Sequence, residues 1–114
     1  MDMMLLGETV TAKESGQDNL GFWMPAGGND GVAGCEVFFV TGVDSFEVHL
    51  DTKSSDQDDA SAASIGSVVI SSSTPQSYKF DVAAARDLVR YRVASVRGGH
   101  SVHLQFAQPL WQPN

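Results

Sequence analysis

The fold is decided by residues 88–106, whose sequence is LVRYRVASVRGGHSVHLQF. Apolar residues occupy every second position on both sides of a glycine pair, first as Val89, Tyr91 and Val93 and then as Val102, Leu104 and Phe106. Alternation with period two predicts strands that bury one face. The glycines within residues 97–100 predict a hairpin turn, because such turns need positive φ. The stretch therefore predicts two antiparallel strands joined by a tight turn.

The same alternation recurs earlier in the chain, as Phe46, Val48 and Leu50 and then as Tyr78, Phe80 and Val82. Further strands are expected within residues 5–12, 35–41 and 65–71, and the apolar run at 35–41 indicates a central strand. The only helix candidate is a single turn at 83–87. About seven or eight short strands with Gly- and Ser-rich connections predict an all-β fold, an antiparallel β-sandwich or jelly roll with at most one helical turn.

The composition favours one folded domain over residues 1–114, since 42% of the chain is hydrophobic and 18% is charged. Within it we expect a glycine-rich loop near 26–34 and a proline- and tryptophan-containing tail at 108–114. The apolar run at 1–6 is too short and too acidic for a signal peptide. No apolar run approaches the length of a membrane span, so we expect no membrane partner.

Charge divides along the chain. Residues 1–60 contain twelve acids and two bases, a formal charge of −10, whereas residues 61–114 contain two acids and five bases, a formal +3. The net charge of −7 argues against direct nucleic-acid binding, because domains that bind nucleic acid are basic. Fields of opposite sign on one small protein favour association with copies of itself or with a complementary surface.

The positive charge comes mainly from four arginines near the predicted hairpin. Arginine pairs with carboxylates in a fixed, bidentate geometry and is enriched at interfaces. A tryptophan in a proline-bracketed tail can also anchor in a neighbour. The sequence therefore predicts an interface made by Arg86, Arg90, Arg92, Arg97 and Trp111. Two alternatives stay open: the arginines balance Glu47 or Asp51 of the same chain, and the tryptophan folds back onto its own domain.

The acidic loop around Asp56, Asp58 and Asp59 is the best metal candidate, because calcium prefers several carboxylate oxygens from a flexible loop. Its spacing lacks the glycine and the closing glutamate of an EF-hand, and the alternative is a solvated loop. The sequence contains no recognisable catalytic motif. The surroundings of Cys35 in the sequence predict a small buried hydrophobic residue. We expect no enzyme activity and no cofactor.

Three segments carry a resemblance to a known class: FEVHLDTK at 46–53, DLVRYRV at 87–93 and QFAQPLW at 105–111. Together they resemble small β-sandwich proteins of tailed-phage particles. The resemblance covers about half of the chain. It implies a non-enzymatic virion protein, a head decoration or cement protein that forms homo-oligomers and binds a lattice such as the major capsid protein. It would be made in the host cytoplasm and reside in the virion.

Two other classes stay open beside this one. The first is a calcium- or carbohydrate-binding β-sandwich module that uses the acidic loop and an exposed aromatic residue such as Trp23. The second is a small β-sandwich enzyme.

Overall fold

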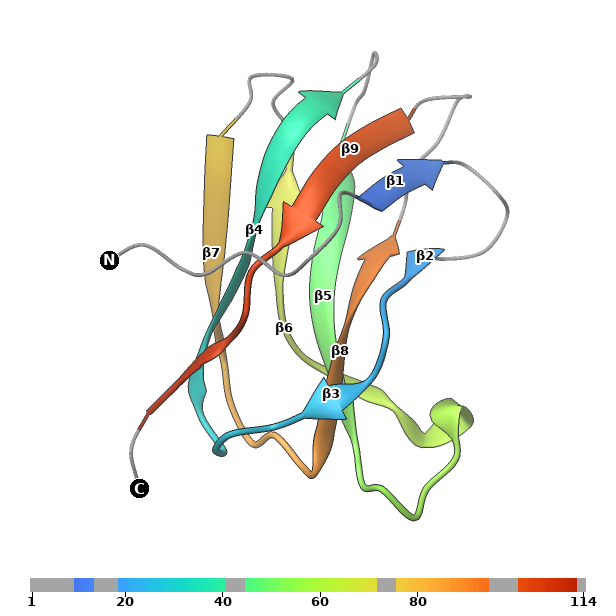
Figure 1. Cartoon of the computed structure of the whole chain (residues 1–114), viewed down its shortest axis with the longest axis vertical. Coiled ribbons are helices and arrows are strands. Elements are labelled where there is room, and N and C mark those ends of the chain that lie inside the picture. Colours follow the sequence, from blue (N-terminus) through green and yellow to red (C-terminus); the bar gives the residue numbers. More distant parts are fainter. Residues whose placement is uncertain (1–9, 14–18, 41–44, 72–75, 95–100, 113–114) are drawn as a thin grey trace.

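A computed structural model describes residues 10–13, 19–40, 45–71, 76–94 and 101–112. In these segments the chain is almost entirely β, and its single helical element is the 3-10 turn η1, which is too short to cross a membrane (Figure 1). The predicted all-β class is confirmed. The elements in chain order are β1 (Val10–Lys13), β2 (Asn19–Leu20), β3 (Met24–Pro25), β4 (Gly31–Val40), β5 (Phe46–Lys53), η1 (Asp59–Ser61), β6 (Ala63–Ile70), β7 (Gln76–Val82), β8 (Leu88–Ala94), β9 (Ser101–Phe106) and β10 (Leu110–Trp111).

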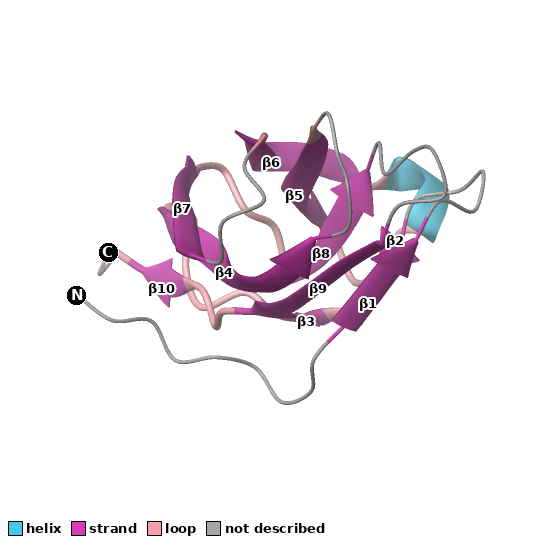
Figure 2. Ribbon diagram, turned by 90° about the horizontal axis from the view of Figure 1, so that it is seen from above, coloured by secondary structure: helices cyan, strands magenta, loops and turns pink. Residues whose placement is uncertain are grey.

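The strands form two antiparallel sheets that pack face to face (Figure 2). Sheet I has the order β1-β9-β4-β7, and β10 continues the line of β9 along the same edge of β4. Sheet II has the order β2-β8-β5-β6, and β3 continues the line of β2 along β8. The ten segments thus fill eight strand positions, and β4 is central as its apolar sequence predicts.

The predicted hairpin of residues 88–106 is therefore wrong: β8 lies in sheet II and pairs with β5, whereas β9 lies in sheet I and pairs with β4. The alternation indicates the buried face of each strand but not its partner, and the predicted turn at 97–100 lies outside the described residues.

The core lies between the two sheets and is built from the alternating rows that the sequence predicts. Val48, Leu50, Val89, Val93 and their counterparts in sheet I are fully buried. Tyr78 is the one member of the predicted rows that stays partly exposed, and it packs against the edge of the core. Burial of one face of each strand is the main stabilising contribution in such a sandwich.

Tyr91 of β8 links the two sheets through its hydroxyl group. The hydroxyl donates a hydrogen bond to the Ala107 carbonyl oxygen at 2.5 Å and accepts one from the Gly34 backbone N–H at 3.1 Å. The Ala107 N–H in turn donates to the Gly34 carbonyl oxygen at 2.9 Å. The Tyr91 ring stacks on Phe106 with a centroid separation of 4.5 Å. Burial raises the pKa of this hydroxyl above its ordinary value, so it acts as a neutral donor.

The prediction of a helical turn at 83–87 is wrong. The backbone of this segment is held by tertiary hydrogen bonds: the N–H groups of Ala83 and Ala85 donate to the Ile65 and Asn29 carbonyl oxygens, at 3.3 and 2.8 Å, and the Arg86 N–H donates to the Thr52 hydroxyl at 2.7 Å. Ala84 also has a φ of 61°, which interrupts a right-handed helix. Tertiary hydrogen bonds outweigh the helix propensity of the three alanines.

The glycine-rich loop is shorter than residues 26–34, because β4 already begins at Gly31. At that position β4 is paired with both β7 and β10, and a side chain would collide with the Leu110 backbone. Gly27 and Gly28 lie against the Trp111 ring, which leaves no room for a Cβ atom at Gly27. The glycines thus allow the C-terminal segment to approach closely.

We expect Tyr91→Phe to lower the free energy of unfolding by about 1–3 kcal/mol, because it leaves the buried Gly34 N–H without an acceptor. Urea unfolding at neutral pH measures this change. The matched control is Tyr78→Phe, which removes a hydroxyl bonded to the exposed Gln76 side chain and should cost much less. Equal losses for the two variants would contradict the linking role of Tyr91.

Candidate functional site

The polar residues of β5 and β8 line the face of sheet II that points away from sheet I, which we call the outer face. Cross-strand partners project to the same side of a sheet, and the register pairs His49 with Arg92 and Asp51 with Arg90. Asp51, Lys53 and Arg90 are nevertheless buried. They are covered because Trp23 and the segment that follows β5 fold back over this face.

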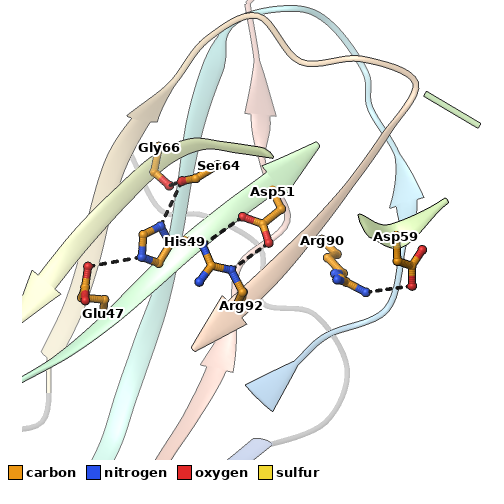
Figure 3. Close-up of polar contacts among 8 residues, drawn as sticks. All are labelled: Glu47, His49, Asp51, Asp59, Ser64, Gly66, Arg90 and Arg92. Carbon is orange, nitrogen blue, oxygen red and sulfur yellow. Dashed lines mark hydrogen bonds and ion pairs between the residues drawn. The ribbon is translucent and has the colours of Figure 1, made fainter. Parts of the chain in front are cut away.

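Arg92 and Asp51 form the most buried ion pair on the outer face (Figure 3). Arg92 Nε lies 2.9 Å from Asp51 Oδ2, and Arg92 Nη2 lies 3.4 Å from Asp51 Oδ1. The pair runs diagonally between the strands, since Asp51 stands directly opposite Arg90. This bidentate contact realises the intrachain alternative for this arginine that the sequence left open.

A second group, the Trp23 cluster, consists of Trp23, Lys53, Asp59 and Arg90. Asp59 Oδ1 lies 2.8 Å from Lys53 Nζ and accepts a hydrogen bond from Trp23 Nε1 at 3.1 Å, while Asp59 Oδ2 lies 3.4 Å from Arg90 Nη1. The indole ring contacts both cations, with Lys53 Nζ 4.8 Å and Arg90 Cζ 4.4 Å from its centroid. One carboxylate and one ring thus hold two buried cations.

The electrostatics of the Trp23 cluster follow from these contacts. The hydrogen bond from Lys53, followed by attraction to the nearby cations, holds the pKa of Asp59 below its ordinary value. Arg90 Nε is buried and has no hydrogen-bond partner among the described residues. Because stripping water from a cation is costly, removal of Asp59 would leave the buried Lys53 and Arg90 without their carboxylate partner.

The loop between β5 and η1 is secured by further polar contacts. Gln57 accepts hydrogen bonds through its side-chain oxygen from the Ser54 N–H at 2.8 Å and from Arg86 at 3.0 Å. Ser55 donates through its N–H and its hydroxyl to Asp87, at 3.2 and 3.0 Å. Arg86, one of the predicted interface residues, therefore contacts its own chain.

Ser64, His49 and Glu47 form a connected row on the outer face (Figure 3). His49 Nδ1 is 2.9 Å from Ser64 Oγ, and His49 Nε2 is 3.3 Å from Glu47 Oε1. The order of groups is that of a serine–histidine–acid relay, but the two ring nitrogens are exchanged, since in the relay Nε2 faces the serine and Nδ1 faces the acid. Acyl transfer would also need donors for an oxyanion beside the serine. The other side-chain contact of Ser64 is an acceptor, the Gly66 carbonyl oxygen at 3.3 Å.

The remaining predicted residues are placed apart from this row. Trp111 packs against the core of its own domain, on Gly27 and Gly28, and Arg97 lies outside the described residues. Of the predicted metal ligands, Asp56 is exposed, Asp58 accepts a hydrogen bond from Ser61, and Asp59 faces the two cations, so the three carboxylates do not converge on one point. In the described part of the chain, no three His, Cys, Asp or Glu side chains could hold a metal ion.

Cys35 lies in the core, and burial raises the pKa of its thiol to about 12. A thiolate nucleophile is therefore absent at neutral pH at this position, in agreement with a structural role.

Sequence reasoning missed the role of Lys53 and took Trp23 for an exposed aromatic residue, whereas its ring is half-buried against Lys53 and Arg90. Lys53 continues the alternation of Glu47, His49 and Asp51, so its projection from the same face was readable from the sequence. The approach of Trp23 was not readable, because its segment pairs with β8, which is distant in the chain.

We expect Asp59→Asn to destabilise the fold at neutral pH but not in acid. Since the folded-state pKa of Asp59 lies below the ordinary value of 3.8, its contribution is complete above that value and is lost as the pH falls through the folded-state pKa. Urea unfolding of both proteins from about pH 7 down to about pH 2 measures the difference. Asp58→Asn, which affects an exposed contact to Ser61, is the control. A difference that stays constant with pH would contradict the ionic role of Asp59.

Comparison of the chain with protein-family models, with curated proteins and with solved structures gives no match. The contacts of the outer face are therefore the basis on which a function is assigned. These contacts connect β5, β8 and the Asp59 segment, and they pair the charges of the outer face.

Proposed function

We propose that this protein is a non-enzymatic structural component of a tailed-phage particle, a head decoration or cement protein. In this role it binds the major capsid protein and copies of itself. The segments that carry the resemblance to such proteins fall in β5, β8 and the β9–β10 region. They contribute to both sheets and to the C-terminal segment that closes on the glycine loop.

The observation that carries the proposal is the local neutrality of the outer face. Three acids, Glu47, Asp51 and Asp59, stand beside three bases, Lys53, Arg90 and Arg92, so their formal charges sum to zero on a chain whose net charge is −7. Because the main ion pairs are made within the chain and Asp51, Lys53 and Arg90 are already buried, a protein that contacts this face would strand few charges without a partner. Such a face suits permanent protein contact.

Large apolar side chains flank this neutral region. Leu20 is 53% exposed and pairs with Arg92, and Val69 is 62% exposed and pairs with Glu47, so both belong to the outer face. Phe22, in the segment between β2 and β3, is 68% exposed. Burial of apolar surface contributes about 25 cal/mol per Å², and aromatic residues are enriched at interface centres. Burial of these three side chains would contribute to the free energy of binding, which the paired charges do not.

We expect the chain to occur in purified phage particles at a fixed ratio to the major capsid protein, which quantitative mass spectrometry of particles from its source measures. Phe22→Asp should abolish that association, because it places a charge where apolar contact is needed. Ser77→Asp, on the exposed edge of sheet I, should leave it unchanged. Absence of the wild-type chain from the particles would contradict the proposal.

The enzyme alternative has its own test at Ser64. We expect a fluorophosphonate probe to leave the folded protein unlabelled, because beside His49 the Ser64 hydroxyl contacts the Gly66 carbonyl oxygen, an acceptor that would repel an oxyanion rather than stabilise it. Intact-mass measurement reads out the label, and Ser64→Ala identifies the site. Labelling that needs Ser64 and His49 would contradict a non-enzymatic role.

A further inference from the structure

Strand β6 forms one edge of sheet II, next to β5 (Figure 2). An edge strand presents a row of backbone N–H and C=O groups that can pair with another strand. Proteins protect such edges with charged residues, with proline or by making the strand short. The four edges of the sandwich can therefore be compared by their sequences.

Three of the edges carry this protection. β1 has four residues and ends in Lys13. β2 and β3 have two residues each, and β3 contains Pro25. β7 includes the charged residues Lys79 and Asp81. By contrast, β6 has eight residues, ASIGSVVI, without a charged residue or a proline.

Among the described residues, contacts close only the first half of the β6 edge. Near its start, the Ala83 N–H donates to the Ile65 carbonyl oxygen at 3.3 Å, and Gly66 lies against the backbone of Asp81. These contacts bring β6 and β7 together and close that corner of the sandwich. Farther along, Ser67 and Val69 are exposed, and Val69 is 62% exposed.

We infer that residues 67–69 of β6 pair antiparallel with the same residues of a second copy of this chain, which joins two sandwiches through one continuous sheet. This inference rests on the proposed homo-oligomeric role and names its contact surface. The chain has a net charge of −7, so two copies repel each other except where an uncharged surface meets its like. A two-fold axis brings identical segments together, and a strand without charge is compatible with its own copy.

The geometry of such a pair constrains its register. If the two cores are to stay on one side of the joined sheet, outward residues must oppose outward residues. Ser67 and Val69 share the outer face, so Ser67 of one copy faces Val69 of the other when Val68 lies on the axis. Lysines at both positions would then place like charges directly opposite each other at two points.

The test is sedimentation velocity of the full chain over a range of concentrations, with the double variant Ser67→Lys/Val69→Lys. Within its own sheet, position 69 stands opposite Glu47 and position 67 opposite His49, so the fold should tolerate lysine at both, which a melting curve checks. We expect the wild type to dimerise and the variant to raise the dimer dissociation constant about tenfold or more. Hydrogen exchange at residues 67–69 should slow in the wild-type dimer.

The control variant Ser77→Lys/Gln108→Lys adds the same charge at an exposed position of β7 and at an exposed position between β9 and β10, and it should dimerise like the wild type. A β6 variant that dimerises normally would overturn the inference while leaving the proposed function to the particle experiment. If the wild type is monomeric in solution but the β6 variant is lost from particles, β6 does not pair with a second copy. That result would overturn the inference and indicate that β6 pairs with a strand of the capsid protein instead. A wild type that is monomeric and also absent from particles would overturn both proposals.

Discussion

The buried hydroxyl of Tyr91 is the contact on which the arrangement of the two sheets depends. Hydrophobic burial presses the sheets together but is indifferent to small shifts between them, whereas the bonds from this hydroxyl to Gly34 and Ala107 have a direction. They set β8 against β4 and fix the chain just after β9. From that point β10 reaches the remaining length of β4, and Trp111 closes on the glycine loop.

The position of β8 also determines the outer face. With β8 fixed, its register with β5 sets Arg92 and Asp51 close enough for a bidentate contact and leaves Arg90 beneath Trp23. Asp59 then forms ion pairs with both Lys53 and Arg90. The inner and outer faces of β8 thus have different roles: the inner face links the sheets, and the outer face holds the loop that leads into β6.

The parts of this structure that sequence could predict are those governed by local periodicity. The alternation around Tyr91 and around Val48 gave strands with the correct buried face, because the period of two is a property of the strand itself. The helical turn at 83–87 failed because its N–H groups are bound by residues distant in sequence. The partners of the arginines stayed undecided for the same reason: a diagonal contact such as Arg92–Asp51 depends on strand order, which periodicity does not encode.

The division of charge in the sequence acquires a different meaning in the folded chain. The cationic residues Arg90 and Arg92 do not form a free basic surface, because Asp51 and Asp59 from the acidic half are bound to them. Folding therefore removes this positive region from the surface and leaves the remaining acid excess to repel other copies. Contact between copies of such a protein is favoured where charge is absent or already paired. The uncharged half of β6 and the neutral outer face beside it are continuous through Val69 and Glu47, so a single approach of two copies can use both.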